Sequence, residues 1–183
     1  MLVYKYPRIL ISFIFSFIFL LSCDDAEYQL DNEFDPENLN LSPPTIFFHP
    51  SQFESIEVGS SDTLELYCYE VQSAAGAHLQ IEFDAEIVSI DTVLYGDFFM
   101  NGVNSPIMFT DQEDGFLNVY LFFQPTLGIS DASGTTAMAK LIFSVRDEGL
   151  APIRYTTRTS LRDKNNYPIQ LNQYGEALIN ATN

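Results

Sequence analysis

The chain has 183 residues, of which 46% are hydrophobic and 14% aromatic, although Trp is absent. This length fits one domain and a short accessory segment, and the composition supplies enough apolar residues for a core, which excludes global disorder. The formal net charge is -17 with only eight Lys and Arg residues, which argues against nucleic-acid binding and against adsorption of the folded domain to anionic lipid. We interpret the acidity as a source of solubility. An acidic face for a basic or calcium-loaded partner is the alternative.

The amino terminus has the features of a secretory signal. Lys5 and Arg8 precede an apolar run at residues 9–21, which is shorter than the stretch of about 20 residues that a transmembrane helix needs. Residues 20–23, Leu-Leu-Ser-Cys, resemble a bacterial lipobox. The resemblance implies a signal peptide at residues 1–22 and a lipid on Cys23, and thus a protein of the cell envelope that faces the periplasm or the cell surface. An uncleaved anchor is the alternative.

An extended tether is predicted after the lipidated cysteine, over residues 23–44. Its acidic residues repel one another, and it ends in the stiff pair Pro43 and Pro44. The Asp-x-Asp-x-Asp-Gly pattern of a calcium loop is absent, so we interpret this segment as a solvated spacer.

Cys68 is predicted to be a buried, unreactive residue. With Cys23 lipidated, Cys68 has no partner for an internal disulfide. It stands in phase with Leu64 and Leu66, which predicts that its side chain packs in the core as a small hydrophobic group.

Short strands follow one another from residue 45 to the carboxyl end, because apolar residues alternate with polar ones and Gly, Pro and Asn interrupt the pattern. Strands and shorter extended pieces are predicted at residues 45–49, 55–58, 63–70, 76–83, 88–94, 106–110, 116–123, 136–146, 153–159, 168–171 and 177–179. Turns or loops are predicted at residues 59–62, 111–115, 149–152 and 160–166. About nine strands and no long helix predict an all-β, antiparallel two-sheet sandwich.

Residues 116–123 carry an unusual second face. Their apolar residues alternate with Asn118, Tyr120 and Phe122. A face with this many aromatic groups is expected to be covered or used in binding.

The order of several short motifs resembles a cohesin domain, from about residue 45 to the carboxyl end. The motifs lie at residues 58–59, 62–66, 71–72, 76–84, 88–90, 95–98, 133–135, 138–143 and 161–165. The resemblance implies a nine-stranded jelly-roll sandwich at residues 45–183. It also implies binding to the dockerin modules of secreted enzymes or a place in polysaccharide-degrading surface assemblies.

The resemblance also implies a partner-binding sheet, formed by the strands near residues 76–83, 116–123 and 136–145. Its candidate residues are His78, Gln80, Glu82, Asn118, Tyr120, Phe122, Gln124 and Lys140.

Catalytic and metal-binding patterns are not found. His49 and His78 stand near no Ser-Asp or Cys arrangement, and two histidines without a cysteine cluster do not predict zinc. Carboxylates at residues 111–114 and at Asp163 are interpreted as turn residues rather than calcium ligands. No enzyme activity, metal or cofactor is predicted.

The leading functional hypothesis is a lipid-anchored module that docks a protein partner, namely a dockerin-bearing polysaccharide-degrading enzyme. Because dockerins of the family fold around calcium, the resemblance implies calcium-dependent capture. Direct carbohydrate binding through Tyr95, Tyr120 and Phe122 is one alternative, which the absence of Trp weakens. A structural envelope lipoprotein without a dockerin partner is another.

Overall fold

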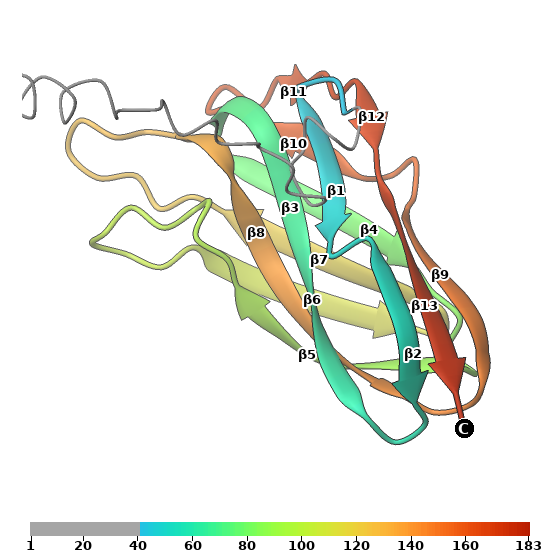
Figure 1. The fold of residues 1–183 in the computed structure, drawn as a ribbon. Helices are drawn as coiled ribbons and strands as arrows, with labels where there is room; N and C mark the ends of the chain where they lie inside the picture. Colours follow the sequence, from blue (N-terminus) through green and yellow to red (C-terminus); the bar gives the residue numbers. More distant parts are fainter. Residues whose placement is uncertain (1–40) are drawn as a thin grey trace, which may run out of the picture.

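The computed structural model describes residues 41–183, which form two β-sheets packed against each other (Figure 1). Apolar and polar residues alternate along many of the strands. Successive side chains of an extended strand point to opposite sides, so each strand can bury one face and expose the other. The first sheet has the order β12-β1-β3-β8-β5: β12 (Gln173–Tyr174), β1 (Thr45–His49), β3 (Ser61–Ala74), β8 (Ala132–Val145) and β5 (Val88–Tyr95).

The second sheet is centred on β4. Its main order is β11-β10-β4-β9-β13-β2: β11 (Pro168–Ile169), β10 (Ser160–Arg162), β4 (Gly76–Glu82), β9 (Gly149–Tyr155), β13 (Glu176–Thr182) and β2 (Gln52–Glu57). On its other side β4 pairs with β7 (Phe116–Phe122), which pairs with β6 (Ile107–Glu113). In Figure 1, β4, β6 and β7 lie behind β1, β3 and β8.

The prediction of an all-β two-sheet sandwich is confirmed, although not every strand pair is antiparallel. The described residues form 13 strands, and β1 with β12 and β2 with β13 are parallel pairs. Pro50 separates β1 from β2. Because proline has no N–H to extend the hydrogen-bond ladder, the first expected strand stops there and the chain continues in the other sheet.

Several predicted turns and loops are instead parts of strands. The hairpin expected at residues 111–115 turns only at Asp114 and Gly115, where Gly115 has a φ of +74°. Residues 111–113 continue β6, and their polarity reflects an exposed edge strand. Residues 149–152 begin β9, and residues 160–162 form β10 beside β4.

The core lies between the sheets and consists of apolar side chains from both. Full burial of one such side chain contributes about 1.5–3 kcal/mol. The largest fully buried residues are Phe48, Phe99, Phe143, Ile46, Leu64, Leu66, Leu79, Ile81, Leu117, Leu121, Met138 and Leu141.

Residues 42–44, which the sequence places in the tether, are held against the sandwich. The Ser42 N–H donates to Gln173 Oε1 over 2.9 Å, and the Asn172 N–H donates to the Pro44 carbonyl over 2.8 Å. The expected signal peptide, Cys23 and the remainder of the tether lie outside the described residues. Within residues 41–183, no helix is long and apolar enough to cross a membrane.

The predicted burial of Cys68 is confirmed, since its side chain has no exposed surface. Its thiol lies 3.2 Å from the Thr136 carbonyl oxygen. Burial raises the pKa of the thiol from 9.0 to about 12, because a thiolate is poorly solvated in the core.

Cys68 is therefore expected to react only when the fold opens. In the chain from residue 24 onward, where it is the sole cysteine, a disulfide reagent at pH 9 should label it many times more slowly than in urea. The raised pKa keeps the native thiol protonated at this pH, whereas the unfolded thiol is partly ionised. Equal labelling rates in both conditions would contradict this account.

Candidate functional site

Five strands of the second sheet, β6, β7, β4, β10 and β9, present a common outer face, the side directed away from the first sheet. Its residues form rows across the sheet because paired residues of neighbouring strands point to the same side. Each row is given in the order β6, β7, β4 and then β10 or β9. The first two rows, which end on β10, are Ile107, Phe122, Gly76 and Arg162, and then Phe109, Tyr120, His78 and Ser160. The third row is Asp111, Asn118 and Gln80, and the fourth, which ends on β9, is Glu113, Phe116, Glu82 and Arg154.

The outer face is apolar at one end and acidic at the other. Ile107, Phe109 and Phe122 expose 44%, 61% and 45% of their surface at the apolar end. In the next two rows, Asp111 and Glu113 are exposed on the same side of β6. A partner would meet hydrophobic contact at one end of this face and negative charge at the other.

The centre of the outer face is a buried polar pair, Gln80 and Asn118, each 8% exposed. Asn118 Oδ1 accepts hydrogen bonds from Gln80 Nε2 and from His78 Nε2, both over 3.0 Å. Because an amide oxygen only accepts, His78 carries a proton on Nε2 when it makes this bond.

The loop between β9 and β10 closes over Gln80. Thr156 Oγ1 donates to Gln80 Oε1 over 2.7 Å, and the Thr159 hydroxyl lies 3.0 Å from both the backbone nitrogen and the carbonyl oxygen of Gln80. Within residues 41–183, every buried side-chain nitrogen or oxygen has a hydrogen-bond partner. A polar centre satisfied in this way is fixed in position before any partner arrives.

His78 and Tyr120 stack on each other next to this centre. Their ring centroids are 4.4 Å apart and their planes differ by 8°. The hydrogen bond from His78 to Asn118 and the stacking with Tyr120 together hold both rings in place.

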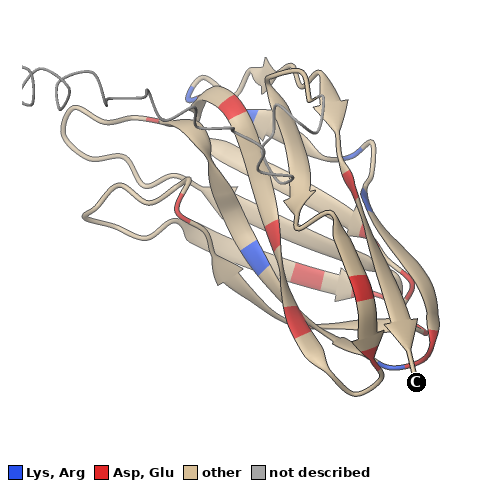
Figure 2. Ribbon diagram, viewed as in Figure 1, with Lys and Arg blue, Asp and Glu red and all other residues tan. Residues whose placement is uncertain are grey.

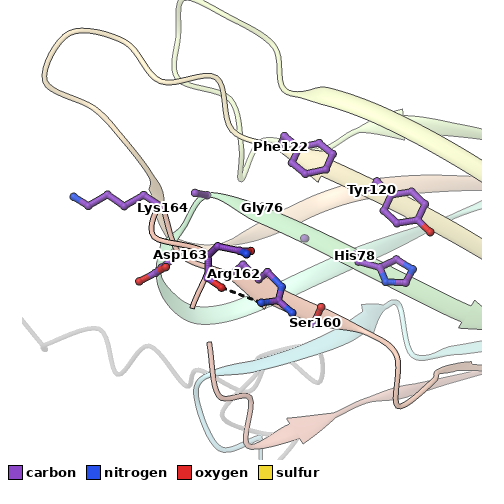
Figure 3. Close-up of a pocket in the computed structure, with 11 residues that line it drawn as sticks. Gly76, His78, Tyr120, Phe122, Ser160, Arg162, Asp163 and Lys164 are labelled. Atoms are coloured by element: carbon purple, nitrogen blue, oxygen red, sulfur yellow. Dashed lines mark hydrogen bonds between the residues drawn. The ribbon is translucent and has the colours of Figure 1, made fainter. Parts of the chain in front are cut away.

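A hollow of about 290 Å³ lies at the apolar end of the face, above Gly76. Figure 3 shows Phe122 and Tyr120 on one side of Gly76 and His78, with Arg162 and Ser160 on the other. The missing side chain of Gly76 leaves the space open.

A second, polar hollow of about 610 Å³ lies over the centre of the face. Its lining residues are His78, Gln80, Glu82, Asp111, Glu113, Phe116, Asn118, Tyr120, Thr156, Thr157 and Arg158. The two hollows share His78 and Tyr120, so they form one continuous surface.

Basic residues are few, but half of them border the outer face. Figure 2 shows Asp and Glu spread over most of the fold, with Lys and Arg in few places. Of the eight Lys and Arg residues in the chain, four lie between residues 154 and 164, namely Arg154, Arg158, Arg162 and Lys164. The β9 and β10 side of the face is thus more basic than the β6 side.

Six of the eight candidate residues predicted from the sequence lie together on this face. These are His78, Gln80, Glu82, Asn118, Tyr120 and Phe122. Gln124 lies just beyond β7, where its side chain donates to the Ser105 carbonyl over 2.8 Å. It therefore links two loops at the edge of the face.

The placement of Lys140 with the other candidates is wrong. Lys140 belongs to β8, which pairs with β3 and β5 in the first sheet. Its ammonium group lies 2.6 Å from Glu65 Oε1, and the hydrogen bond and charge of Glu65 raise the pKa of Lys140. Lys140 thus belongs to a surface ion pair on the opposite side of the sandwich.

Phe109 and Arg162 also belong to the outer face, although neither was predicted from the sequence. The alternation of Ile107 and Phe109 was a usable signal, because it predicts a strand with an apolar side. The region of Arg162 was expected to be a loop, and its pairing with Gly76 depends on a contact between residues distant in the sequence.

The interpretation of Asp163 as a turn residue is confirmed. Its Oδ1 accepts hydrogen bonds from the N–H groups of Asn165 and Tyr167, each over 2.8 Å. Among the residues described, no group of three His, Cys, Asp or Glu side chains is placed to hold a metal ion.

The sequence matches the profile of the cohesin domain over residues 50–173. Because this match covers more than half of the chain, the chain belongs to the cohesin domain family, whose members are non-catalytic protein-binding modules. Comparison with curated protein sequences finds no match.

Solved cohesin structures share the fold at low sequence identity. The third cohesin of ScaC from Acetivibrio cellulolyticus, solved with the ScaB dockerin, is 17% identical with a TM-score of 0.62, covering 76% of this chain and 99% of that one. The sixth cohesin of scaffoldin B from the same organism, solved with a Cel5 dockerin, is 18% identical with a TM-score of 0.60, covering 75% and 98%. A non-cellulosomal cohesin from Archaeoglobus fulgidus is 11% identical with a TM-score of 0.59, covering 76% and 89%.

Replacing Asn118 tests the polar centre. Asn118→Ala leaves the buried Gln80 amide group without its acceptor, so the free energy of unfolding should fall by about 1–3 kcal/mol. Asp111→Ala, at the exposed neighbouring position on β6, should change it by less than about 0.5 kcal/mol. Urea denaturation measures both, and equal effects of the two substitutions would argue against a structural role for the pair.

Proposed function

We propose that this chain is a docking module that binds a protein partner on the outer face, and that the partner is a dockerin-bearing polysaccharide-degrading enzyme. The observation that best supports this proposal is the exposure of Phe109 and Phe122 on the outer face of the second sheet. Aromatic side chains dominate the centres of protein interfaces and are costly to leave in water without a partner.

The polar centre supplies specificity for such a partner. Asn118 is 8% exposed. Its Nδ2 is not one of the fully buried atoms, all of which have hydrogen-bond partners, and it donates none of the hydrogen bonds found within residues 41–183, so it is available to an acceptor on the partner. The fixed positions of Gln80 and Asn118 lower the entropy lost on binding. A partner that buried this row without matching its polar groups would be disfavoured.

Family membership supports the same proposal. Two of the structurally similar cohesins were solved together with dockerins. Because dockerins of this family are expected to fold around calcium, we propose that capture requires this ion on the side of the partner. No catalytic role is proposed for the chain.

We also propose that the domain is anchored by lipid at Cys23 in the cell envelope, facing the periplasm or the cell surface. The apolar run and lipobox-like sequence at residues 9–23 support this placement. The acidic tether then leads to Ser42, where the sandwich begins to hold the chain.

Side-chain truncation on each side of the sandwich tests the docking proposal. Immobilised protein from residue 24 onward, which includes the whole described sandwich, is incubated with secreted and envelope proteins in calcium or in chelator. We expect a dockerin-bearing protein to be captured only in calcium. The double variant Tyr120→Ala and Phe122→Ala should reduce its affinity at least about tenfold, since aromatic residues that an interface buries can contribute about 2 kcal/mol or more.

The matched control is the double variant Leu94→Ala and Tyr95→Ala, which removes two exposed side chains at the end of β5 in the first sheet. Circular dichroism checks that both variants fold. Equal capture by the two variants would contradict docking on the outer face. Absence of any captured protein would favour a polysaccharide ligand or a purely structural role.

A further inference from the structure

The glycine at position 76 is not required by the backbone. Its φ lies outside the left-handed region that favours glycine, and a Cβ added there would lie 3.4 Å from the Leu121 carbonyl oxygen and from Phe122 Cδ1, which is ordinary contact. Gly76 is the first residue of β4, where it is paired with Phe122 on one side and Arg162 on the other, and glycine within a sheet can mark a place where a ligand comes close to the backbone. At Gly76 the consequence is the open hollow beside Phe122.

Arg162 stands directly across the strand pair from Gly76 and borders the same hollow. Its Nη1 donates to the Asn166 carbonyl over 2.9 Å, the bond drawn as a dashed line in Figure 3. This bond holds the guanidinium group in place and leaves its other N–H groups available. Although the chain has 25 Asp and Glu residues, Arg162 forms no ion pair within residues 41–183.

The other charged groups of the hollow are already engaged. Asp163 uses Oδ1 for two backbone N–H groups of its own turn. Lys164 lies 3.8 Å from Asp131 and 3.3 Å from the Ser130 hydroxyl. Of the two cations that border the hollow, Arg162 is therefore the one without a carboxylate partner within residues 41–183, and it stands opposite an aromatic wall.

We propose that this hollow receives one apolar side chain of the docked protein, with a neighbouring side-chain carboxylate of that protein bound to Arg162. The apolar group lies over Gly76 against Phe122, and the carboxylate accepts hydrogen bonds from the guanidinium group, a charge-assisted contact. This inference rests on the proposed docking function and specifies the chemistry of the partner.

The hollow of about 290 Å³ lies beside Tyr120 and Phe122, and this aromatic wall suits an apolar side chain of a protein. The charges also set the direction of docking. If the partner were reversed, its carboxylate would approach Asp111 and Glu113 at the opposite end of the face, where like charges repel.

Small probes test the hollow without knowledge of the partner. Amide resonances of the chain from residue 24 onward are followed by NMR during titration with 3-phenylpropionate, with the uncharged 3-phenylpropanamide, and with glucuronate. We expect 3-phenylpropionate to shift the resonances of Gly76, Phe122 and Arg162, with an affinity about threefold to tenfold higher than that of the amide. Added salt should reduce this difference, because ionic contacts are screened.

Variants separate the apolar and ionic contacts. Gly76→Val fills the hollow with a residue that suits a strand, and it should abolish binding of both phenyl probes while the spectrum remains that of a folded chain. Arg162→Gln should make the acid and the amide bind equally. Arg146→Gln is the matched control, because this cation donates to Ser89 of the first sheet, away from the outer face, and it should leave the preference for the acid unchanged.

Two results would overturn the inference. One is an absence of shifts at Gly76 and Phe122, or an equal response to acid and amide in the unmodified chain. The other is a response to glucuronate alone, which would assign the hollow to an acidic sugar.

If a captured partner binds Gly76→Val and Arg162→Gln as well as it binds the unmodified chain, docking stands and the chemistry proposed for the hollow is wrong. If 3-phenylpropionate binds as expected but no protein is captured, the hollow is supported and the docking proposal fails.

Discussion

The pleat of β4 determines where every part of the candidate site lies. β4 is hydrogen-bonded to β7 along one side and to β10 and β9 along the other, so it cannot rotate to exchange its faces. Leu79 and Ile81 are fully buried in the core, and the same alternation directs His78 and Gln80 outward. A shift of one residue would bury these polar groups and expose the leucine and isoleucine, at a cost of several kcal/mol by rough estimate.

This constraint produces a face with a rigid centre and an open margin. Gln80 and Asn118 are hydrogen-bonded to each other, and Gln80 also bonds to Thr156 and Thr159 of the loop after β9, so the polar groups are arranged in advance. Phe109 and Phe122 at the margin have exposed rings without a covering element. Such a combination offers fixed polar groups for specificity and exposed aromatic rings for hydrophobic contact, and protein-binding modules use both.

The local pattern predicted the architecture and most of the face, whereas contacts between distant segments were harder to predict. Period-two alternation assigns His78 and Asn118 to the outer sides of their strands, since this depends only on neighbouring residues. Alternation cannot tell which sheet a strand joins, and Lys140 was therefore placed on the wrong side. Gly76 and Arg162 are separated by 86 positions in the sequence and meet only through the pairing of β4 with β10.

The proposed docking requires that the partner bind the outer face of the second sheet. Hydroxyl-radical footprinting of the chain with its captured partner tests this directly, because it measures side-chain exposure residue by residue in the unmodified protein. We expect strong protection of Phe109, Tyr120 and Phe122 in the complex, with unchanged labelling of Leu94 and Tyr95 on the first sheet. Protection of Leu94 and Tyr95, with Phe109 and Phe122 still labelled as in the free chain, would contradict it.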